Sequence, residues 1–167
     1  MPSHFYRFQT PFLSNSKMSQ LKIAHPDPKV QEHITKRQQS FTDAFNNASV
    51  PALMAMFAED VEFNDYATGV LNLNRTSLEQ YYSEMVATFR NINIRTKSIS
   101  GSEHFTAWEW DLTMYQLPSE AAADSDSKAE NTIGKEINMV GVSLMWWNAE
   151  GKIIKNHDYG KEVPNAE

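Results

Sequence analysis

Two aspartates are the residues most able to do chemistry, because each lies beside aromatic residues in a predicted strand. Asp65 ends an alternating segment just before Tyr66, and Asp158 lies between His157 and Tyr159. A carboxyl group buried among apolar side chains loses hydration, so its pKa can rise by up to about 3 to 5 units and it can exchange protons near neutral pH. We therefore predict Asp65 and Asp158 as catalytic residues. The alternatives are that Asp65 forms a turn and that Asp158 is a buried acid bonded to a neighbouring tyrosine.

The partners of Asp158 depend on the register of a predicted hairpin. A tight turn containing glycine precedes Lys152. If this turn places Trp147 opposite Lys152, then Ser143 lies opposite Asn156, and Asp158 follows on the same face two residues later. A bulge of one residue would reverse the faces. We predict Ser143 and Asn156 as hydrogen-bonding residues that orient a substrate.

Further substrate-binding candidates lie on the predicted helices and strands. They are expected to line an apolar pocket, and they comprise apolar and aromatic residues together with two acids and a histidine: Phe41, Tyr82, Met85, Trp147, Glu109, Asp111 and His104. Glu109 and Asp111 share one strand face, and their alternative is a solvated or salt-bridged position at a sheet edge. No metal-ligand spacing, phosphate loop, nucleophile elbow or nucleotide fingerprint is present, so we expect neither a metal nor a cofactor.

Composition limits the classes of partner and the location. The chain has 167 residues, 41% of them hydrophobic, which suits one folded domain. The net charge is -6 without a basic cluster, so neither nucleic acid nor an anionic membrane surface is expected as a partner. The absence of cysteine fits a reducing compartment, and we predict a cytoplasmic protein. Residues 1–26 are basic and Ser-rich, which leaves an organelle-targeting segment as the alternative to an irregular arm.

The periodicity of apolar residues predicts helices first and strands afterwards. A long helix runs from Asp27 to about residue 46, and a short one follows Ser49. A strand covers 61–65, and the capping box at 76–79 begins a third helix. The later strands are expected at 92–100, 104–117, 135–147 and 152–160, with a hairpin loop at 118–127. This order predicts a single α+β domain over 27–163, with about three N-terminal helices packed on one face of a curved antiparallel or mixed sheet.

The two adjacent tryptophans predict an interface. Trp146 and Trp147 follow each other on one strand, so their rings point to opposite faces of the sheet. Helices cover only one face, so a second subunit is expected to cover the other, forming a homodimer built sheet to sheet. Trp108, Trp110 and Met114 share a single face of the adjacent strand. The alternative is that some of these rings are partly exposed.

From Phe41 to Tyr159 the sequence resembles the nuclear transport factor 2-like superfamily, in its SnoaL-like branch. Residues 56–65 resemble the helix-to-strand segment of ketosteroid isomerases and place Asp65 at the position of their general base. Residues 151–153 and 157–159 resemble the closing strand of limonene epoxide hydrolases, where an Asp before a Tyr activates water. Polyketide cyclases keep a catalytic Asp on the same strand. The resemblance implies a sheet wrapped with helices into a cone that is open at one end and commonly dimeric.

Several positions depart from the patterns of these enzymes. Phe41 stands where ketosteroid isomerases have the tyrosine of the oxyanion hole, and Ser143 stands where they have its aspartic acid. Residues 109–111 lack the arginine of the Arg-x-Asp of limonene epoxide hydrolases. Scytalone dehydratases use two pocket histidines, and here only His104 and His157 lie on predicted strands.

Two functions follow as hypotheses. The first is a cofactor-independent acid/base enzyme that acts on a small apolar molecule, such as a polyketide or terpenoid, by isomerisation, cyclisation, dehydration or epoxide opening. The second is a non-catalytic ligand-binding or dimerisation module with the same fold, because this fold hosts both functions.

Overall fold

The computed structural model describes residues 27–118 and 134–164. The predicted arm at 1–26 and most of the predicted loop at 118–127 lie outside these residues. The helices are α1 (Pro28–Asn46), α2 (Val50–Met54) and α3 (Arg75–Thr88). The strands are β1 (Phe57–Asp65), β2 (Val70–Leu73), β3 (Phe89–Gly101), β4 (Phe105–Gln116), β5 (Lys135–Trp147) and β6 (Ile153–Val163).

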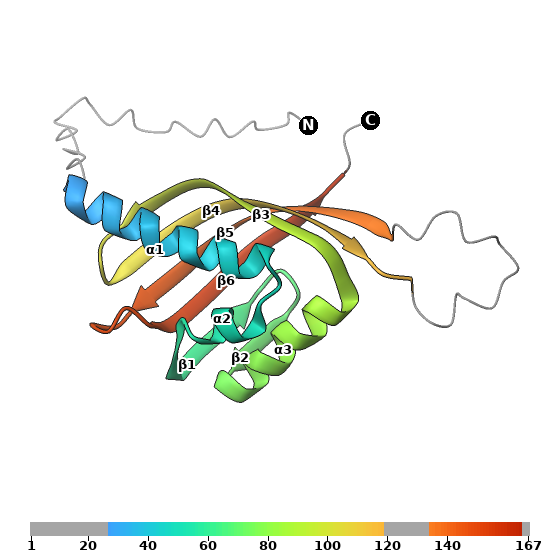
Figure 1. Ribbon diagram of the computed structural model, residues 1–167, viewed down its shortest axis with the longest axis horizontal. Coiled ribbons are helices and arrows are strands. Elements are labelled where there is room, and N and C mark those ends of the chain that lie inside the picture. The colour runs from blue at the N-terminus through green and yellow to red at the C-terminus, as the bar shows by residue number, and fades with distance from the viewer. Residues whose placement is uncertain (1–26, 119–133, 165–167) are drawn as a thin grey trace, which may run out of the picture.

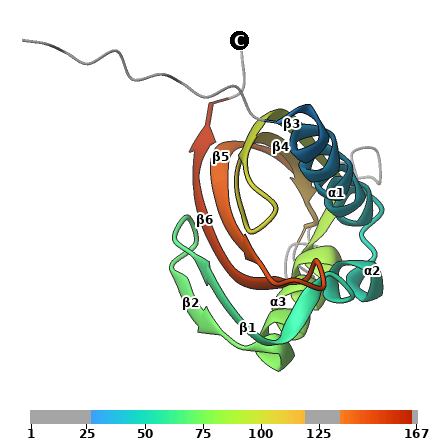
Figure 2. The same ribbon diagram turned by 90° about the vertical axis from the view of Figure 1, so that its left-hand side faces the viewer.

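The strands form one six-stranded sheet in the order β2-β1-β6-β5-β4-β3. β1 and β6 are parallel and all other neighbours are antiparallel, so the sheet is mixed. The sheet curves strongly, and α1 and α3 lie on its inner side (Figures 1 and 2). The predicted α+β class, with about three helices against a curved mixed sheet, is confirmed. The parallel pair matters for the site because it joins the first and last strands of the chain.

Helix α1 is anchored at both ends. The Asp27 side chain caps its start by accepting a hydrogen bond from the Lys29 amide at 2.8 Å, with Pro28 in the first turn. At the other end Asn46 donates to the Ile94 carbonyl at 3.0 Å and accepts from the Ile94 amide at 2.6 Å. This two-point contact fixes the end of α1 on β3, and so holds the apolar face of the helix over the sheet.

The capping box predicted at 76–79 is wrong. Helix α3 begins at Arg75, and its cap is Asn74, whose side chain accepts a hydrogen bond from the Ser77 amide at 3.1 Å. Asparagine is as effective a capping residue as serine and more effective than threonine. The cap therefore lies two residues earlier than predicted, and Leu78 and Tyr82 remain on the buried face of the helix.

The first strands also differ from the prediction. β1 begins at Phe57, shortly after α2 ends at Met54, and not at residue 61 as predicted. The short strand β2 was not predicted. In the predicted strand at 104–117, His104 lies in the turn before β4.

The register of the β5–β6 hairpin was predicted wrongly, although the faces were predicted correctly. Trp147 pairs with Ile153, and the register then shifts once more, so that Ser143 pairs with Asp158 instead of Asn156. The observed pairing at Ser143 therefore differs from the predicted pairing by two residues. Because side chains alternate between the faces with a period of two, a difference of two residues leaves each side chain on its predicted face. Ser143 and Asp158 therefore share the inner face.

The tryptophans occupy both faces of the sheet. Trp108, Trp110 and Met114 are buried beneath the helices, and Trp147 is buried on the same inner face. Trp146 lies on the outer face, half-buried against Phe105 and His157. In the part of the chain that the structure describes, the helices are too short or too polar to cross a membrane. The cytoplasmic location and the covering of the outer face stay predictions.

Candidate functional site

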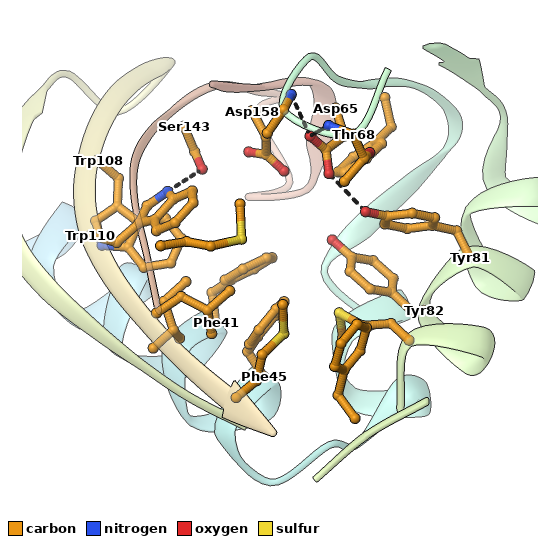
Figure 3. A pocket seen from close by; sticks show the side chains of 18 residues that line it. Phe41, Phe45, Asp65, Thr68, Tyr81, Tyr82, Trp108, Trp110, Ser143 and Asp158 are labelled. Atoms are coloured by element: carbon orange, nitrogen blue, oxygen red, sulfur yellow. Dashed lines mark hydrogen bonds between the residues drawn. The ribbon is translucent and has the colours of Figure 1, made fainter. Parts of the chain in front are cut away.

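An apolar cavity lies between the curved sheet and helices α1 and α3 (Figure 3). Its volume is about 150 Å³, which is comparable to cavities that hold a benzene-sized molecule. Phenylalanine, tryptophan, methionine and other apolar side chains make most of its wall. The polar groups gather at the part of the wall formed by β1, β5, β6 and the first half of α3. The cavity thus offers one polar patch to an otherwise apolar ligand.

The structure brings six of the predicted site residues to this cavity: Asp65, Asp158, Ser143, Phe41, Tyr82 and Met85. The two acids are register partners in the parallel β1–β6 pair, so their Cα atoms lie side by side on neighbouring strands. Both carboxyl groups belong to the cavity wall (Figure 3). Residues 93 positions apart in the chain therefore contribute to one site.

Asp158 has the environment of a proton carrier. Asp158 is half-buried and lines a cavity whose wall is mostly apolar, so its carboxyl group is poorly hydrated. Burial raises the pKa of Asp158 to about 7, and the charge of Asp65 acts in the same direction. Hydrogen bonds from Ser143 and Asn156 act against this rise by stabilising the carboxylate. Asn156 Nδ2 lies 2.8 Å from Asp158 Oδ1. Asp158 is therefore able to exist in both protonation states near neutral pH.

The Ser143 hydroxyl is oriented by a tryptophan. Trp110 Nε1 donates to Ser143 Oγ at 2.9 Å, which leaves the hydroxyl hydrogen free to point at Asp158, its cross-strand partner. A Cβ atom at Gly141 would lie 2.3 Å from the Trp110 ring. Glycine at this position therefore lets the indole lie against β5, where its N–H group reaches Ser143.

Asp65 is held by hydrogen bonds from the protein. Its Oδ1 accepts from the amides of Ala67 at 2.9 Å and Thr68 at 3.1 Å, and its Oδ2 accepts from the Tyr81 hydroxyl at 2.7 Å. The first two bonds form the turn between β1 and β2, which is the turn-forming alternative noted from the sequence. Asp65 thus lines the cavity while its carboxylate is occupied on both oxygens.

Two adjacent tyrosines on α3 differ in their hydrogen bonds. Tyr81 donates to Asp65, whereas the Tyr82 hydroxyl has no hydrogen-bond partner among the described residues. The pKa of each phenol is raised, chiefly by burial and then by the charge of Asp65 at Tyr81 and of Asp158 at Tyr82. Both phenols therefore keep their protons at neutral pH.

Five predicted site residues do not line the cavity. Asn156 lies behind Asp158 and binds it, and the Trp147 indole donates to Thr106 Oγ1 at 2.9 Å beneath Arg37. His104 lies in the β3–β4 turn. Glu109 and Asp111 lie on the outer face, where each is within ion-pair distance of Lys97 Nζ, at 3.4 and 3.6 Å. For Glu109 and Asp111, the structure therefore agrees with the alternative prediction of a salt-bridged position.

Several lining residues were not predicted from the sequence, and those that bear polar groups are Tyr81, Thr68, Trp108 and Trp110. Trp110 was placed on the correct shared face but was not assigned to the site. Tyr81 lies one residue before the apolar stripe of its helix, and only its distance to Asp65 shows its role. No pattern in the sequence would have indicated that contact.

The arrangement can move a proton within an apolar enclosure. Asp158 supplies the exchangeable proton, and Tyr82 supplies a hydroxyl group that remains available. Among residues 27–118 and 134–164, no cluster of three or more His, Asp or Glu side chains is arranged to hold a metal ion. The titratable groups on the cavity wall are the carboxyl groups of Asp65 and Asp158 and the phenols of Tyr81 and Tyr82.

A curved mixed sheet with helices closing over an apolar cavity is the nuclear transport factor 2-like fold. Residues 38–156 match the SnoaL-like domain family. Cyclase aurE of Calcarisporium arbuscula is 31% identical over 137 residues, which cover 81% of this chain and 90% of that protein. The chain belongs to the SnoaL-like family.

Solved structures support the fold. PrhC of Penicillium brasilianum superposes with a TM-score of 0.61 at 10% identity, over 78% of this chain and 82% of that chain. IdmH of Streptomyces antibioticus, described as a candidate polyketide cyclase, gives a TM-score of 0.58 at 12% identity, over 76% and 91%. At these identities the likeness is one of fold.

Proposed function

We propose that the protein is a cofactor-independent acid/base enzyme in which Asp158 carries the proton. The observation that supports this proposal is the position of Asp158 in the wall of an apolar cavity with a pKa of about 7. A carboxyl group so tuned can remove a proton from carbon and return it to another atom of the same molecule. The relationship to a protein named as a cyclase favours cyclisation or isomerisation over the other reactions considered.

The substrate is a small and largely apolar molecule, of polyketide or terpenoid type. Aromatic side chains from α1 and β4, including Phe41, Phe45 and Trp108, form the apolar wall opposite the acids. Such a wall binds flat, unsaturated surfaces through burial and ring contacts. The polar end of the substrate lies at Asp158, where the chemistry occurs.

Asp65 has a supporting role in this proposal. Three hydrogen bonds fix its carboxylate, and its negative charge helps to raise the pKa of Asp158. The same three bonds are the observation that favours the second candidate function, a ligand-binding module, because they leave one of the two predicted acids without a free oxygen.

The proposal is tested by proton exchange, which does not require the natural substrate. We expect the protein to catalyse exchange of the CH₂ hydrogens of 2-indanone, a flat aromatic ketone, for deuterium in heavy water. The carboxylate is the active base, so the rate per enzyme rises with pH and levels off above the Asp158 pKa of about 7. Proton NMR measures the loss of the CH₂ signal. Exchange that follows only the hydroxide concentration, for 2-indanone and for larger aryl ketones, would contradict catalysis and support the binding module.

We also propose a homodimer that forms through the outer face of β5 and β6. Val140 and Val142 are each 37% exposed there, and Tyr159 is 44% exposed and stacked on Tyr66 at 4.8 Å. The neighbouring β3 and β4 carry both lysine and acidic residues on the same face. An apolar strip beside charges of both signs can match a second copy of itself around a two-fold axis.

Val142→Glu is expected to convert the dimer to a monomer, because it places a charge in the centre of the apolar strip opposite Tyr159. Light scattering coupled to size exclusion measures the molar mass. Lys36→Glu, at an exposed position of α1, is the matched control and leaves the mass unchanged. A wild-type protein that is monomeric at all concentrations tested would remove this interface.

A further inference from the structure

The polar groups of the cavity differ in whether the protein already occupies them. Asp65 accepts three hydrogen bonds, and Tyr81 donates one of them. Thr68 bonds the Tyr81 oxygen with its side chain, and Trp110 donates to Ser143. Each of these groups is committed to another residue of the chain.

Tyr82 is the exception among the described polar residues that line the cavity. Tyr82 is 3% exposed, and its ring packs against Phe45, Phe57 and Phe63. Its hydroxyl lies on the side of the cavity where the carboxyl groups are (Figure 3), and no hydrogen bond joins it to any described residue. The Tyr82 oxygen is not one of the fully buried polar atoms that lack a partner, so it is accessible from the cavity that Tyr82 lines, and a ligand there can accept its hydrogen bond. We therefore expect the Tyr82 hydroxyl to form its hydrogen bond with the ligand.

Tyr82 and Asp158 line the same cavity of about 150 Å³, so one small molecule can contact both groups. When a base removes a proton from the carbon beside a carbonyl group, the C–H electron pair moves into the new C–C double bond and the carbonyl oxygen becomes negative. A fixed hydrogen-bond donor aimed at that oxygen stabilises the transition state. A phenol that keeps its proton meets this requirement.

We propose that the Tyr82 hydroxyl is a further catalytic group, which donates a hydrogen bond to the substrate oxygen that becomes negative when Asp158 takes a proton from carbon. The inference rests on the proposed function. Asp158 then returns the proton to carbon or oxygen, so the protein ends unchanged. The hydroxyl is delivered by α3, whereas α1 presents Phe41, a residue without a hydrogen-bonding group, to the same cavity.

The test uses phenolates, which carry a negative oxygen on a flat apolar body. The probe is 4-nitrophenol above its pKa, titrated calorimetrically into the Asp158→Asn variant, because asparagine resembles the protonated acid and removes the like charge. We expect Tyr82→Phe in this background to weaken binding by about 10- to 100-fold, since hydrogen bonds to charged groups are the strong ones. Nitrobenzene, which lacks the phenolate oxygen, should bind both variants equally.

Tyr81→Phe is the matched control on the neighbouring residue. Its hydroxyl is spent on Asp65, so the affinity for 4-nitrophenolate should change by no more than about two- to threefold, while the melting temperature falls. Tyr82→Phe should keep or raise the melting temperature, because no protein acceptor is left unpaired. This combination of lost affinity and retained stability distinguishes a ligand-facing hydroxyl from a structural one.

Two outcomes would overturn the inference. One is equal 4-nitrophenolate affinity with and without the Tyr82 hydroxyl, and the other is an equal loss for Tyr81→Phe and Tyr82→Phe. The titration measures binding and needs no turnover. If 2-indanone exchange depends on Asp158 while Tyr82→Phe leaves both exchange and phenolate binding unchanged, the proposed function survives and this inference fails. If exchange is absent but Tyr82→Phe still weakens phenolate binding, the proposed proton-transfer reaction fails, and Tyr82 remains a group that binds a negative oxygen.

Discussion

Asp158→Asn is expected to lower the catalysed exchange rate by about 100- to 10,000-fold, which is the range typical of a single general acid or base. Asparagine has nearly the same shape, and its remaining oxygen can still accept the hydrogen bond that Asn156 donates to Asp158 Oδ1. Its amide neither ionises nor acts as a base at neutral pH. The variant should therefore fold normally and bind apolar ligands while losing the chemical step. The rate of deuterium incorporation into 2-indanone, compared with the melting temperature of the same sample, measures both properties.

Asp65→Asn is the informative control for this experiment. Its side chain would keep one oxygen for the amides of Ala67 and Thr68 but would turn an NH₂ group toward Tyr81, which now donates to Asp65. We expect a lower melting temperature and a smaller loss of rate than at Asp158. A larger loss of rate for Asp65→Asn than for Asp158→Asn would assign the proton transfer to Asp65 and reject our assignment.

The second large effect concerns the dependence of stability on pH. The pKa of Asp158 is raised from 3.8 to about 7 in the folded protein, so between these values the folded state binds more protons than the unfolded chain. The stability from this group is fully present below the unfolded pKa and is lost as the pH rises through the folded pKa. Its contribution to the free energy of unfolding therefore falls by at most about 1.4 kcal/mol per pH unit over this interval.

Comparison of wild type with Asp158→Asn isolates this contribution, because asparagine does not titrate. Urea unfolding at several values between about pH 5 and pH 8 should show the wild type losing stability relative to the variant by up to a few kcal/mol. Water in the cavity would reduce the size of the effect without changing its sign. A difference that is constant with pH would mean that Asp158 ionises as it does in the unfolded chain, and the assignment of Asp158 as proton carrier would then lose its basis.

Local pattern was sufficient to predict much of the fold. Apolar spacing of 3.6 identified α1, and alternation with a period of two identified the long strands. The same alternation predicted that Trp146 and Trp147 face opposite sides and that Ser143 and Asp158 face the same side. These inferences held because they depend on neighbours within one strand or one hairpin.

Contacts between distant segments were beyond these patterns. The parallel pairing of β1 with β6 puts Asp65 beside Asp158, but nothing in either segment specifies the other as its partner. The Asp65–Tyr81 bond likewise depends on how α3 crosses the first strand. The sequence therefore identified both acids but did not distinguish the one bound by the protein from the one whose pKa burial raises.

The register of the β5–β6 hairpin, which shifts once between Trp146 and Trp147, has a consequence for how this site can diverge. If no bulge absorbs it, the loss or gain of a single residue in the loop would turn the last strand over, exposing Asp158 to solvent and carrying His157 and Tyr159 into the cavity. A length change of one residue therefore preserves the chemistry only where a bulge takes it up. A homologue whose loop differs by one residue without such a bulge would place the imidazole of His157 or the phenol of Tyr159 in the cavity instead of the Asp158 carboxyl group.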